Sequence, residues 1–400
     1  MALTRKGAAR RQERIEALER PDYGWIWKPL LVLLVIALLI AVALGIWWSR
    51  TPAGFDVEQA TAAQRTDTSP AARGAVTTAT LMTTLDTLLD KPGGYLRNDL
   101  TPPGVWLDNM PSWELGVLNQ TRDLSRALPA MEEGNFALLD EVAERLTHDS
   151  DAWFYPSTEH QLEESLVSLE GYLEALGTQN AGFAAGAGLA GWLDQVAQRL
   201  DGLGMRLSAS VGSRDRLREL GLDDAELPPR TPWYRVDNIF FEARGSGWAL
   251  VHLLEAMRRD QADVLEAAGA LDDLALLVAE LERTQRRLWS PMILNGSGFG
   301  VFANHSLVMA NHVVRARDLT RQIAGQVAEA VDAGAVDSPE DNATVAPPVE
   351  DVERSEDADQ PASTEATPSP ESTGAPESTD DSTRDQAADG AEEASTADPQ

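Results

Sequence analysis

The longest apolar run of the chain extends from Leu30 to Trp48, nineteen residues without a charged or strongly polar side chain. With a rise of about 1.5 Å per residue, a helix of this length measures roughly 28 Å, close to the hydrocarbon thickness of a bilayer. Trp27 precedes the run and Trp47 and Trp48 end it, and such rings favour the two headgroup levels. The pattern predicts a single transmembrane helix over residues 29–48.

Basic residues are distributed unequally on the two sides of this run. Seven lie within residues 1–28, whereas only Arg50 and Arg65 follow the run before Arg73. The positive-inside rule therefore predicts a cytoplasmic N-terminus and a C-terminal body on the other side of the membrane. A cleaved signal peptide is the alternative, because Ala41 and Ala43 have the spacing of a cleavage site. The apolar run continues past that site to Trp48, which favours an uncleaved anchor.

Beyond residue 75 the apolar positions recur with helical spacing. Leucines at 162, 166, 169, 173 and 176 follow a 4-3-4-3 pattern, and similar seams begin at Leu189 and Leu271. Segments that alternate with period two are scarce. We expect an all-α fold, with the periplasmic body an antiparallel helical bundle or two stacked bundles.

Several breaks separate the expected helices. A helix containing Leu85 should stop at residues 91–94, and residues 93–110 combine turn residues with aromatic ones, which predicts a loop folded back on the helical body. Ser112 is the expected N-cap of the next helix, with Glu114 in its first turn, and Ser157 should cap a later helix. A last helix of about thirty residues should end near Val331.

The net charge of the chain is −31, and its uneven distribution separates an acidic tail from the helical body. Residues 337–400 hold nineteen acidic residues and two arginines, without Leu, Ile or aromatic residues, so this tail should be disordered. The expected parts are a cytoplasmic basic segment (1–28), a transmembrane helix (29–48), a linker (49–74), a helical periplasmic domain (75–335) and a disordered acidic tail (336–400).

Composition also restricts the partners. The body is itself acidic, which disfavours nucleic acid and anionic lipid surfaces. The absence of Cys excludes disulfides and thiol chemistry. Only three of the thirty-three basic residues are Lys, a bias that fits either a salt-loving bacterium or GC-rich codon usage.

The first group of candidate ligand-binding residues lies in and just after the 93–110 loop: Tyr95, Asp99, Trp106, Asp108, Trp113 and Glu114. Carboxylates beside aromatic rings are what glycan binding or cleavage requires. The structural alternative is that the acidic residues cap turns and helix ends while the rings pack the loop.

The second group is a seven-residue repeat, Asn304-His305 and Asn311-His312, behind a glycine-rich loop at residues 295–300. Seven helical residues span roughly 10.5 Å, too far for both imidazoles to bind one zinc ion, so we expect no metal site. The surrounding residues are apolar, and a helix apolar almost all round should be buried. The four polar side chains should then find partners inside the body or line a pocket. The glycine loop could cradle an anion, but the Lys-Ser/Thr of a phosphate-binding loop is missing.

Residues 242–248, EARGSGW, suggest a helix crossing. Glu242 and Arg244 are two residues apart and do not face each other on a helix, so each should pair with another helix. Gly245 and Gly247 should permit a close approach by a neighbouring helix.

Three blocks carry a resemblance to a known family: GGYLRNDLTPPGVWLDNMPSWELGVL, TPWYRVDNIFFEARGSGWALVHLLEAM and SPMILNGSGFGVFANHSLVMANHVVRA. They resemble the proteobacterial single-pass envelope proteins catalogued as domain of unknown function 2333, over roughly residues 23–330. The resemblance implies an inner-membrane anchor and an exported helical body, and it transfers no catalytic residue. The acidic tail lies outside the family pattern.

These observations favour a structural or partner-binding component of the bacterial cell envelope, integral to the inner membrane, with an envelope protein as partner and no cofactor. The alternative is an enzyme or binding protein that acts on peptidoglycan or lipid head groups through the 93–114 loop. A sensor of periplasmic state is a third possibility, which the short cytoplasmic segment disfavours. The oligomeric state is left open.

Overall fold

The computed structural model describes residues 24–65, 71–134, 137–176, 181–209, 232, 235–287, 293 and 305–336. In this described part the fold is all-helical, as expected, with eleven α-helices and no strand. The basic segment before residue 24, the glycine-rich loop, Asn304 and the acidic tail from residue 337 lie outside the described residues.

The helices follow the expected seams closely. They are α2 (Gly24–Trp48), α3 (Val57–Gln64), α4 (Ala75–Asp90), α5 (Asn109–Met131), α6 (Ala137–Leu146), α7 (Thr158–Ala175), α8 (Leu189–Ala209), α10 (Val236–Asp260), α11 (Ala262–Ala267), α12 (Leu271–Thr284) and α13 (His305–Asp332), with a 3-10 turn at Gly104–Trp106. Ser157 caps α7 as predicted, its side chain accepting a hydrogen bond from the backbone N–H of His160.

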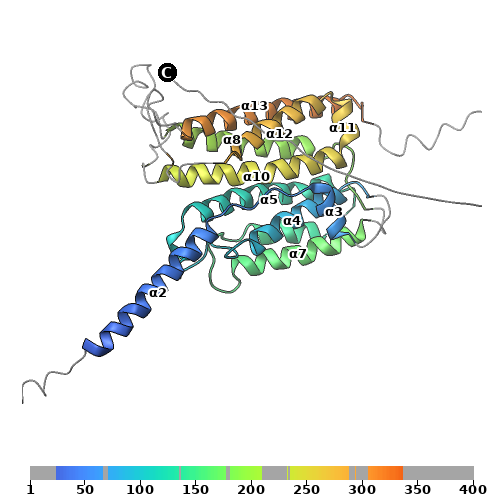
Figure 1. Cartoon of the computed structure of the whole chain (residues 1–400). Helices are drawn as coiled ribbons and strands as arrows, with labels where there is room; N and C mark the ends of the chain where they lie inside the picture. The colour runs from blue at the N-terminus through green and yellow to red at the C-terminus, as the bar shows by residue number, and fades with distance from the viewer. Residues whose placement is uncertain are drawn as a thin grey trace, which may run out of the picture. The chain divides into compact units, whose positions relative to one another are not determined.

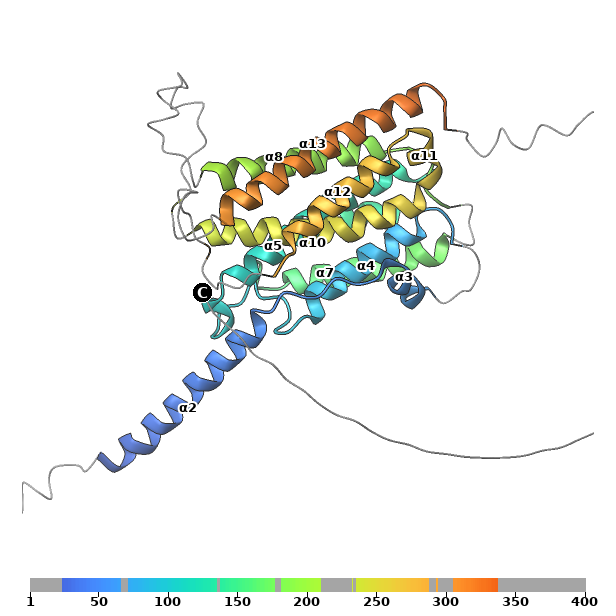
Figure 2. The ribbon, with the colours of Figure 1, turned by 45° about the horizontal axis from the view of Figure 1, so that its top comes forward.

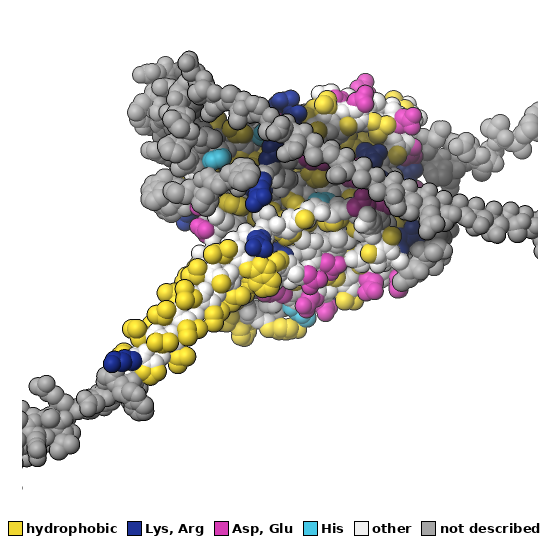
Figure 3. All heavy atoms as spheres, viewed as in Figure 1, with side chains coloured by type: hydrophobic (Ala, Val, Ile, Leu, Met, Phe, Trp, Pro, Cys, Tyr) yellow, Lys and Arg dark blue, Asp and Glu magenta, His cyan; other side chains and the backbone are white. Residues whose placement is uncertain are grey.

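Helix α2 is the predicted apolar helix, and it begins five residues before the expected boundary. Its residues 27–48 are long and apolar enough to cross a membrane. Its side chains are exposed, Leu33 and Leu34 to 65% each, and they form a continuous apolar surface (Figure 3). A signal sequence passes the same test of length and composition.

The segment after α2 differs from the expected linker. Residues 57–64 form helix α3, capped by Asp56 and packed on α4 with Val57 and Ala60 buried. The alternation of polar and small residues hid this helix, because only one of its faces contributes to the core.

Helix α10 is the centre of the body. It packs along α5 and also contacts α4, α8, α12 and α13. Figures 1 and 2 show α8, α12 and α13 on one side of α10, and α4 and α7 on the other. The seam leucines fill the interior: Leu162, Leu169, Leu200 and Leu274 are at most 2% exposed. Burial of these side chains is the main favourable term for the fold.

The crossing of α5 and α10 depends on glycine, as predicted for Gly245. A methyl group on Gly245 would overlap the carbonyl oxygen of Trp113, and one on Gly116 would overlap that of Glu242. The two backbones therefore meet with no side chain between them. This contact holds the start of α5, and with it the 93–110 loop, in a fixed position against the centre of the body.

Candidate functional site

The 93–110 loop folds back on the body, as predicted, and an ion pair between Lys91 and Glu114 holds it there. The Lys91 ammonium lies 2.5 Å from the Glu114 carboxylate, and the two side chains are 1% and 0% exposed. Glu114 also accepts a hydrogen bond from the backbone N–H of Leu96 at 3.0 Å, and the Lys91 ammonium donates to the carbonyl oxygen of Gly94. Burial raises the pKa of Glu114 and lowers that of Lys91, and each partner's charge opposes the shift.

This arrangement corrects the predicted start of α5. The helix begins at Asn109, and Ser112 is not its N-cap: the hydroxyl donates back to the carbonyl oxygen of Asp108 at 2.7 Å. Glu114 does not face solvent at a helix start but points inward to Lys91. The reason is tertiary: Lys91 follows the end of α4, and its buried ammonium requires a negative partner, which Glu114 of α5 supplies.

Two of the predicted ligand-binding rings belong to the core. Tyr95 is 4% exposed, and its hydroxyl donates to the carbonyl oxygen of Ser150 at 2.7 Å. Burial raises the pKa of Tyr95 far above its usual value. Trp113 is completely buried and packs edge-on against Trp248, with ring centroids 5.2 Å apart. Neither ring is accessible to a ligand.

The rest of the group lies at the surface. Trp106 is 58% exposed at the end of the 3-10 turn, and Asp108 is an exposed residue before α5 that makes no side-chain cap. Asp99 alone lines a cleft of about 520 Å³. Burial raises the pKa of Asp99, and the charge of Glu159 raises it further.

The cleft lies between the 93–110 loop and the segment that connects α6 to α7. Its lining residues are Arg97, Asn98, Asp99, Leu100, Asp149, Asp151, Ala152, Trp153 and Phe154. The two walls are joined by hydrogen bonds, from Asn98 to the carbonyl oxygen of Ala152 at 2.9 Å and from Arg97 to the hydroxyl of Ser150 at 2.9 Å. The sequence interpretation missed the second wall. The run Trp153-Phe154-Tyr155 between two helices was the signal that could have revealed it.

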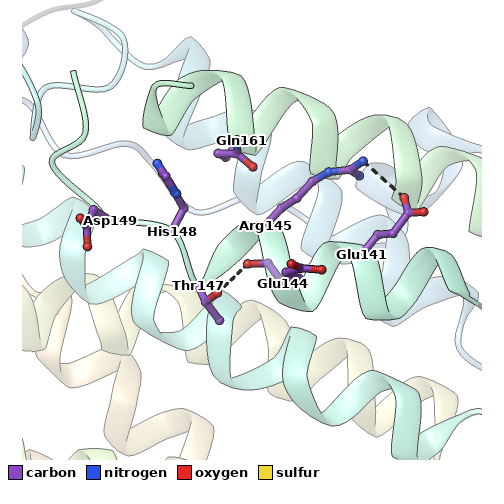
Figure 4. A pocket seen from close by; sticks show the side chains of 7 residues that line it. All are labelled: Glu141, Glu144, Arg145, Thr147, His148, Asp149 and Gln161. Carbon is purple, nitrogen blue, oxygen red and sulfur yellow. Dashed lines mark hydrogen bonds and ion pairs between the residues drawn. The ribbon is translucent and has the colours of Figure 1, made fainter. Parts of the chain in front are cut away.

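A larger cleft of about 700 Å³ lies beside it, between α6 and α7 (Figure 4). Two contacts join its lining residues: Arg145 lies 3.3 Å from the Glu141 carboxylate, and the Thr147 hydroxyl donates to the Glu144 carbonyl oxygen. Because its lining residues are all polar or charged, this cleft is the weaker candidate.

The sequence interpretation also missed His252, which attaches the segment after α2 to the body. His252 is 4% exposed; its Nε2 accepts the backbone N–H of Phe55 at 3.0 Å, and its Nδ1 lies 2.7 Å from the carbonyl oxygen of Trp248. The Phe55 ring stacks on the imidazole at 4.0 Å. Burial lowers the pKa of His252, so the ring is held as the neutral acceptor that Phe55 requires.

The 305–312 repeat is not the buried face that its apolar neighbours predicted. Asn311 is exposed, as are Leu307 and Val308 at 46% and 54%. Of the described residues of the repeat, His312 has an interior partner, with Nδ1 2.6 Å from the buried carboxylate of Glu280, while His305 is half-buried beside Phe240. Helix α13 is amphipathic because it lies on α8 and α12 at the surface of the body. Among the described residues, no three His, Asp or Glu side chains converge as metal ligands.

Comparison with known proteins gives one finding. No curated protein and no solved structure matches the chain. Residues 21–323 match the bacterial family described as "uncharacterized protein conserved in bacteria", domain of unknown function 2333. This match contains α2, both walls of the cleft and the centre of the body, and it ends within α13. The chain therefore belongs to that family, as its three sequence blocks indicated.

Proposed function

We propose that the protein is a single-pass component of the bacterial inner membrane that acts by binding an envelope partner. In this proposal α2 spans the membrane with the N-terminus in the cytoplasm, and the body is a periplasmic antiparallel bundle. The observation that carries the proposal is that the end of α2 and the segment after it pack against the body at three successive points.

Three contacts make up this junction. Gly45 of α2 packs on Pro103 and Leu107: a methyl group placed there would lie 3.7 and 3.9 Å from their side chains. One turn later, the Trp48 ring packs on Gly93. Phe55 then docks on His252. A tether needs none of these contacts, so the junction suits a protein that presents one surface at a constant height above the membrane.

The loop removes two of the three carboxylates that the sequence predicted for catalysis. Glycan cleavage requires two accessible carboxylates on either side of the bond. Glu114 is buried and paired with Lys91, and Asp108 lies outside the cleft lining. Of the three carboxylates predicted from the sequence, only Asp99 is left for chemistry.

Action on glycan or lipid head groups is a second candidate, which the raised pKa of Asp99 favours. A carboxyl group with a raised pKa, in a cleft that Asp149 and Asp151 also line, could serve as an acid. The variant Asp99→Asn separates the two candidates. Loss of phenotype with unchanged folding favours the second, whereas an unchanged phenotype leaves binding by the body as the function.

The topology can be tested on the full chain, because it contains no Cys. Leu276→Cys, on the exposed face of α12, should react with an impermeant maleimide in spheroplasts. Ala8→Cys should react only after lysis. The reverse pattern would overturn the orientation. Recovery of a mature chain that starts after Ala43 would replace the anchor with a signal peptide.

The partner can be sought with a photo-crosslinking residue at Asp151 in native membranes, and with the same residue at Leu276 in a second variant. The proposal expects a discrete protein adduct from at least one of the two positions. The absence of a protein adduct from both positions would contradict a partner bound by these faces of the body.

A further inference from the structure

The exposed aromatic side chains of the body lie in the two segments that form the walls of the cleft. Six large apolar residues of these segments are at least half exposed, a group called here the aromatic rim: Leu100 (60%), Val105 (50%) and Trp106 (58%) in the 93–110 loop, and Trp153 (61%), Phe154 (74%) and Tyr155 (72%) between α6 and α7. Leu100, Trp153 and Phe154 line the cleft itself. Outside α2, the other large apolar side chains exposed in the described part are aliphatic or Met, and they are spread over α7, α8, α12 and α13. A concentration of this kind marks an interaction surface.

The rim lies next to the membrane helix. Val105 and Trp106 stand between Pro103 and Leu107, the two residues that pack against Gly45 of α2. The other half of the rim is tied to the same loop by the hydrogen bond from Asn98 to Ala152. Figure 3 shows hydrophobic side chains on the body beside the end of α2.

The loop that carries the rim is held firmly relative to α2. The buried pair of Lys91 and Glu114 fixes the loop on α4 and α5, and the Trp48 ring packs against Gly93. Trp47 and Trp48 end the apolar run and therefore mark the level at which α2 leaves the hydrocarbon. The rim is consequently held close to headgroup level.

We propose that the aromatic rim inserts into the headgroup region of the membrane that α2 crosses, so that the body rests on the bilayer beside its own anchor. This inference rests on the proposed transmembrane role of α2. Trp and Tyr rings favour this interface because their apolar bodies leave water while their polar atoms stay hydrated. Asp99, Asp149 and Asp151 in the cleft behind the rim disfavour an anionic surface, so the fitting surface is zwitterionic.

The absence of Cys permits a direct test with single-cysteine variants of the full chain. Phe154→Cys would carry an environment-sensitive fluorophore in phosphatidylcholine vesicles. Leu276→Cys, at a position 59% exposed on α12, is the water-facing control, and Leu33→Cys, at a position 65% exposed on α2, is the membrane control. Each label is challenged with a lipid that carries a spin label near its head group, and separately with aqueous iodide.

The proposal expects the lipid quencher to reduce the fluorescence at positions 154 and 33 several-fold more than at 276, with iodide showing the reverse order. Iodide quenching at 154 equal to that at 276 would overturn the inference. If the label at 33 were still quenched by lipid in that case, α2 would still span the membrane, and only the insertion of the rim would be excluded. Protection of 154 from both quenchers would also overturn it, because a protein or a second copy would then cover the rim. A label at 33 that is quenched by iodide alone would overturn the transmembrane role itself.

Discussion

Residues 93–114 and residues 305–315 share a sequence pattern, with polar and charged side chains among apolar ones. In the fold, however, the polar side chains of the two regions differ in burial. In the first region Glu114 is completely buried and paired with Lys91. In the second, Asn311 faces solvent, and His312 reaches the buried carboxylate of Glu280. The first region lies between the ends of α4 and α5, whereas the second lies along the outer face of α13.

The difference shows that residue type and spacing indicate amphipathicity but do not say which neighbour will cover a given face. Where the loop covers the ends of α4 and α5, Lys91 and Glu114 must satisfy each other internally, since water cannot reach them. A helix at the surface can leave its polar residues solvated at little cost. Substitutions should therefore be far more damaging in the first region than in the second.

The largest effect is expected from breaking the buried pair. Lys91→Met or Glu114→Leu leaves one charge buried without its partner, which should lower the free energy of unfolding by about 3–5 kcal/mol. Guanidinium denaturation of the full chain in detergent micelles, followed by circular dichroism, measures the loss.

Two further variants sharpen this test. The double variant Lys91→Met/Glu114→Leu should recover most of the stability, because no charge is left unpaired. Arg258→Met, which removes an exposed partner of Glu255, should cost at most about 1 kcal/mol. A single Lys91 or Glu114 variant that costs no more than Arg258→Met would show that the interior of the loop is hydrated.

Gly245 and Gly204 compare the packing of the same two regions, because Gly245 faces Trp113 of the first region and Gly204 faces Val314 of the second. A methyl group on Gly245 would meet the backbone of Trp113, whereas one on Gly204 would lie 3.1 Å from a side-chain methyl of Val314. Gly245→Ala should cost about 1–3 kcal/mol, because backbone cannot move aside. Gly204→Ala should be close to neutral, since alanine's gain of about 1 kcal/mol in a helix offsets a small side-chain shift.

Thermal denaturation of the two glycine variants beside Gly202→Ala checks this expectation. A methyl group on Gly202 would have open space around it, so Gly202→Ala should stabilise the protein. Equal losses for Gly245→Ala and Gly204→Ala would mean that α8 and α13 pack as rigidly as α5 and α10.

Much of the helical scaffold could be predicted because its cause is local. The apolar run of α2, the leucine seams of α7 and α8 and the cap at Ser157 each depend on residues a few positions apart. The close approach at Gly245 was also predicted, since Gly245 and Gly247 stand two residues apart in a segment with helical spacing and leave room for a neighbouring backbone.

The site itself could not be predicted to the same extent because its partners are distant in the chain. Phe55 and His252 are 197 residues apart, and the two walls of the cleft meet through Asn98 and Ala152, which belong to different helix connections. No local pattern encodes which ends of α4 and α5 meet, so Glu114 was expected at a solvated helix start. Accessibility, which separates Trp106 from Trp113, is a property of the assembled body.

A pH effect is expected at the junction with α2. The pKa of His252 is lowered in the fold from its usual 6.5, so below pH 6.5 the unfolded chain binds more protons than the folded one. The contribution of His252 to the free energy of unfolding is therefore fully present above pH 6.5. It declines as the pH falls toward the folded pKa, by up to about 1.4 kcal/mol per pH unit.

Comparison with His252→Gln isolates this contribution, because glutamine does not titrate and retains a donor and an acceptor. Subtracting its unfolding free energy from that of the wild type between pH 7.5 and pH 5 removes the contributions of the carboxylates. A difference that stays constant over this range would show that the proton does not compete with the Phe55 contact.

The smallest effects are expected in the 305–315 region, where two neighbouring residues test the comparison most directly. His312→Ala removes a partner of Glu280, but Arg283 still lies 2.5 Å from that carboxylate, so the loss should be about 1 kcal/mol. Asn311→Ala should change stability by less than about 0.5 kcal/mol, because the side chain is exposed. Urea denaturation of both variants in micelles resolves this difference. A loss above about 1.5 kcal/mol for Asn311→Ala would mean that this face of α13 is covered in the full chain, and the two regions would then differ in their partners and not in their burial.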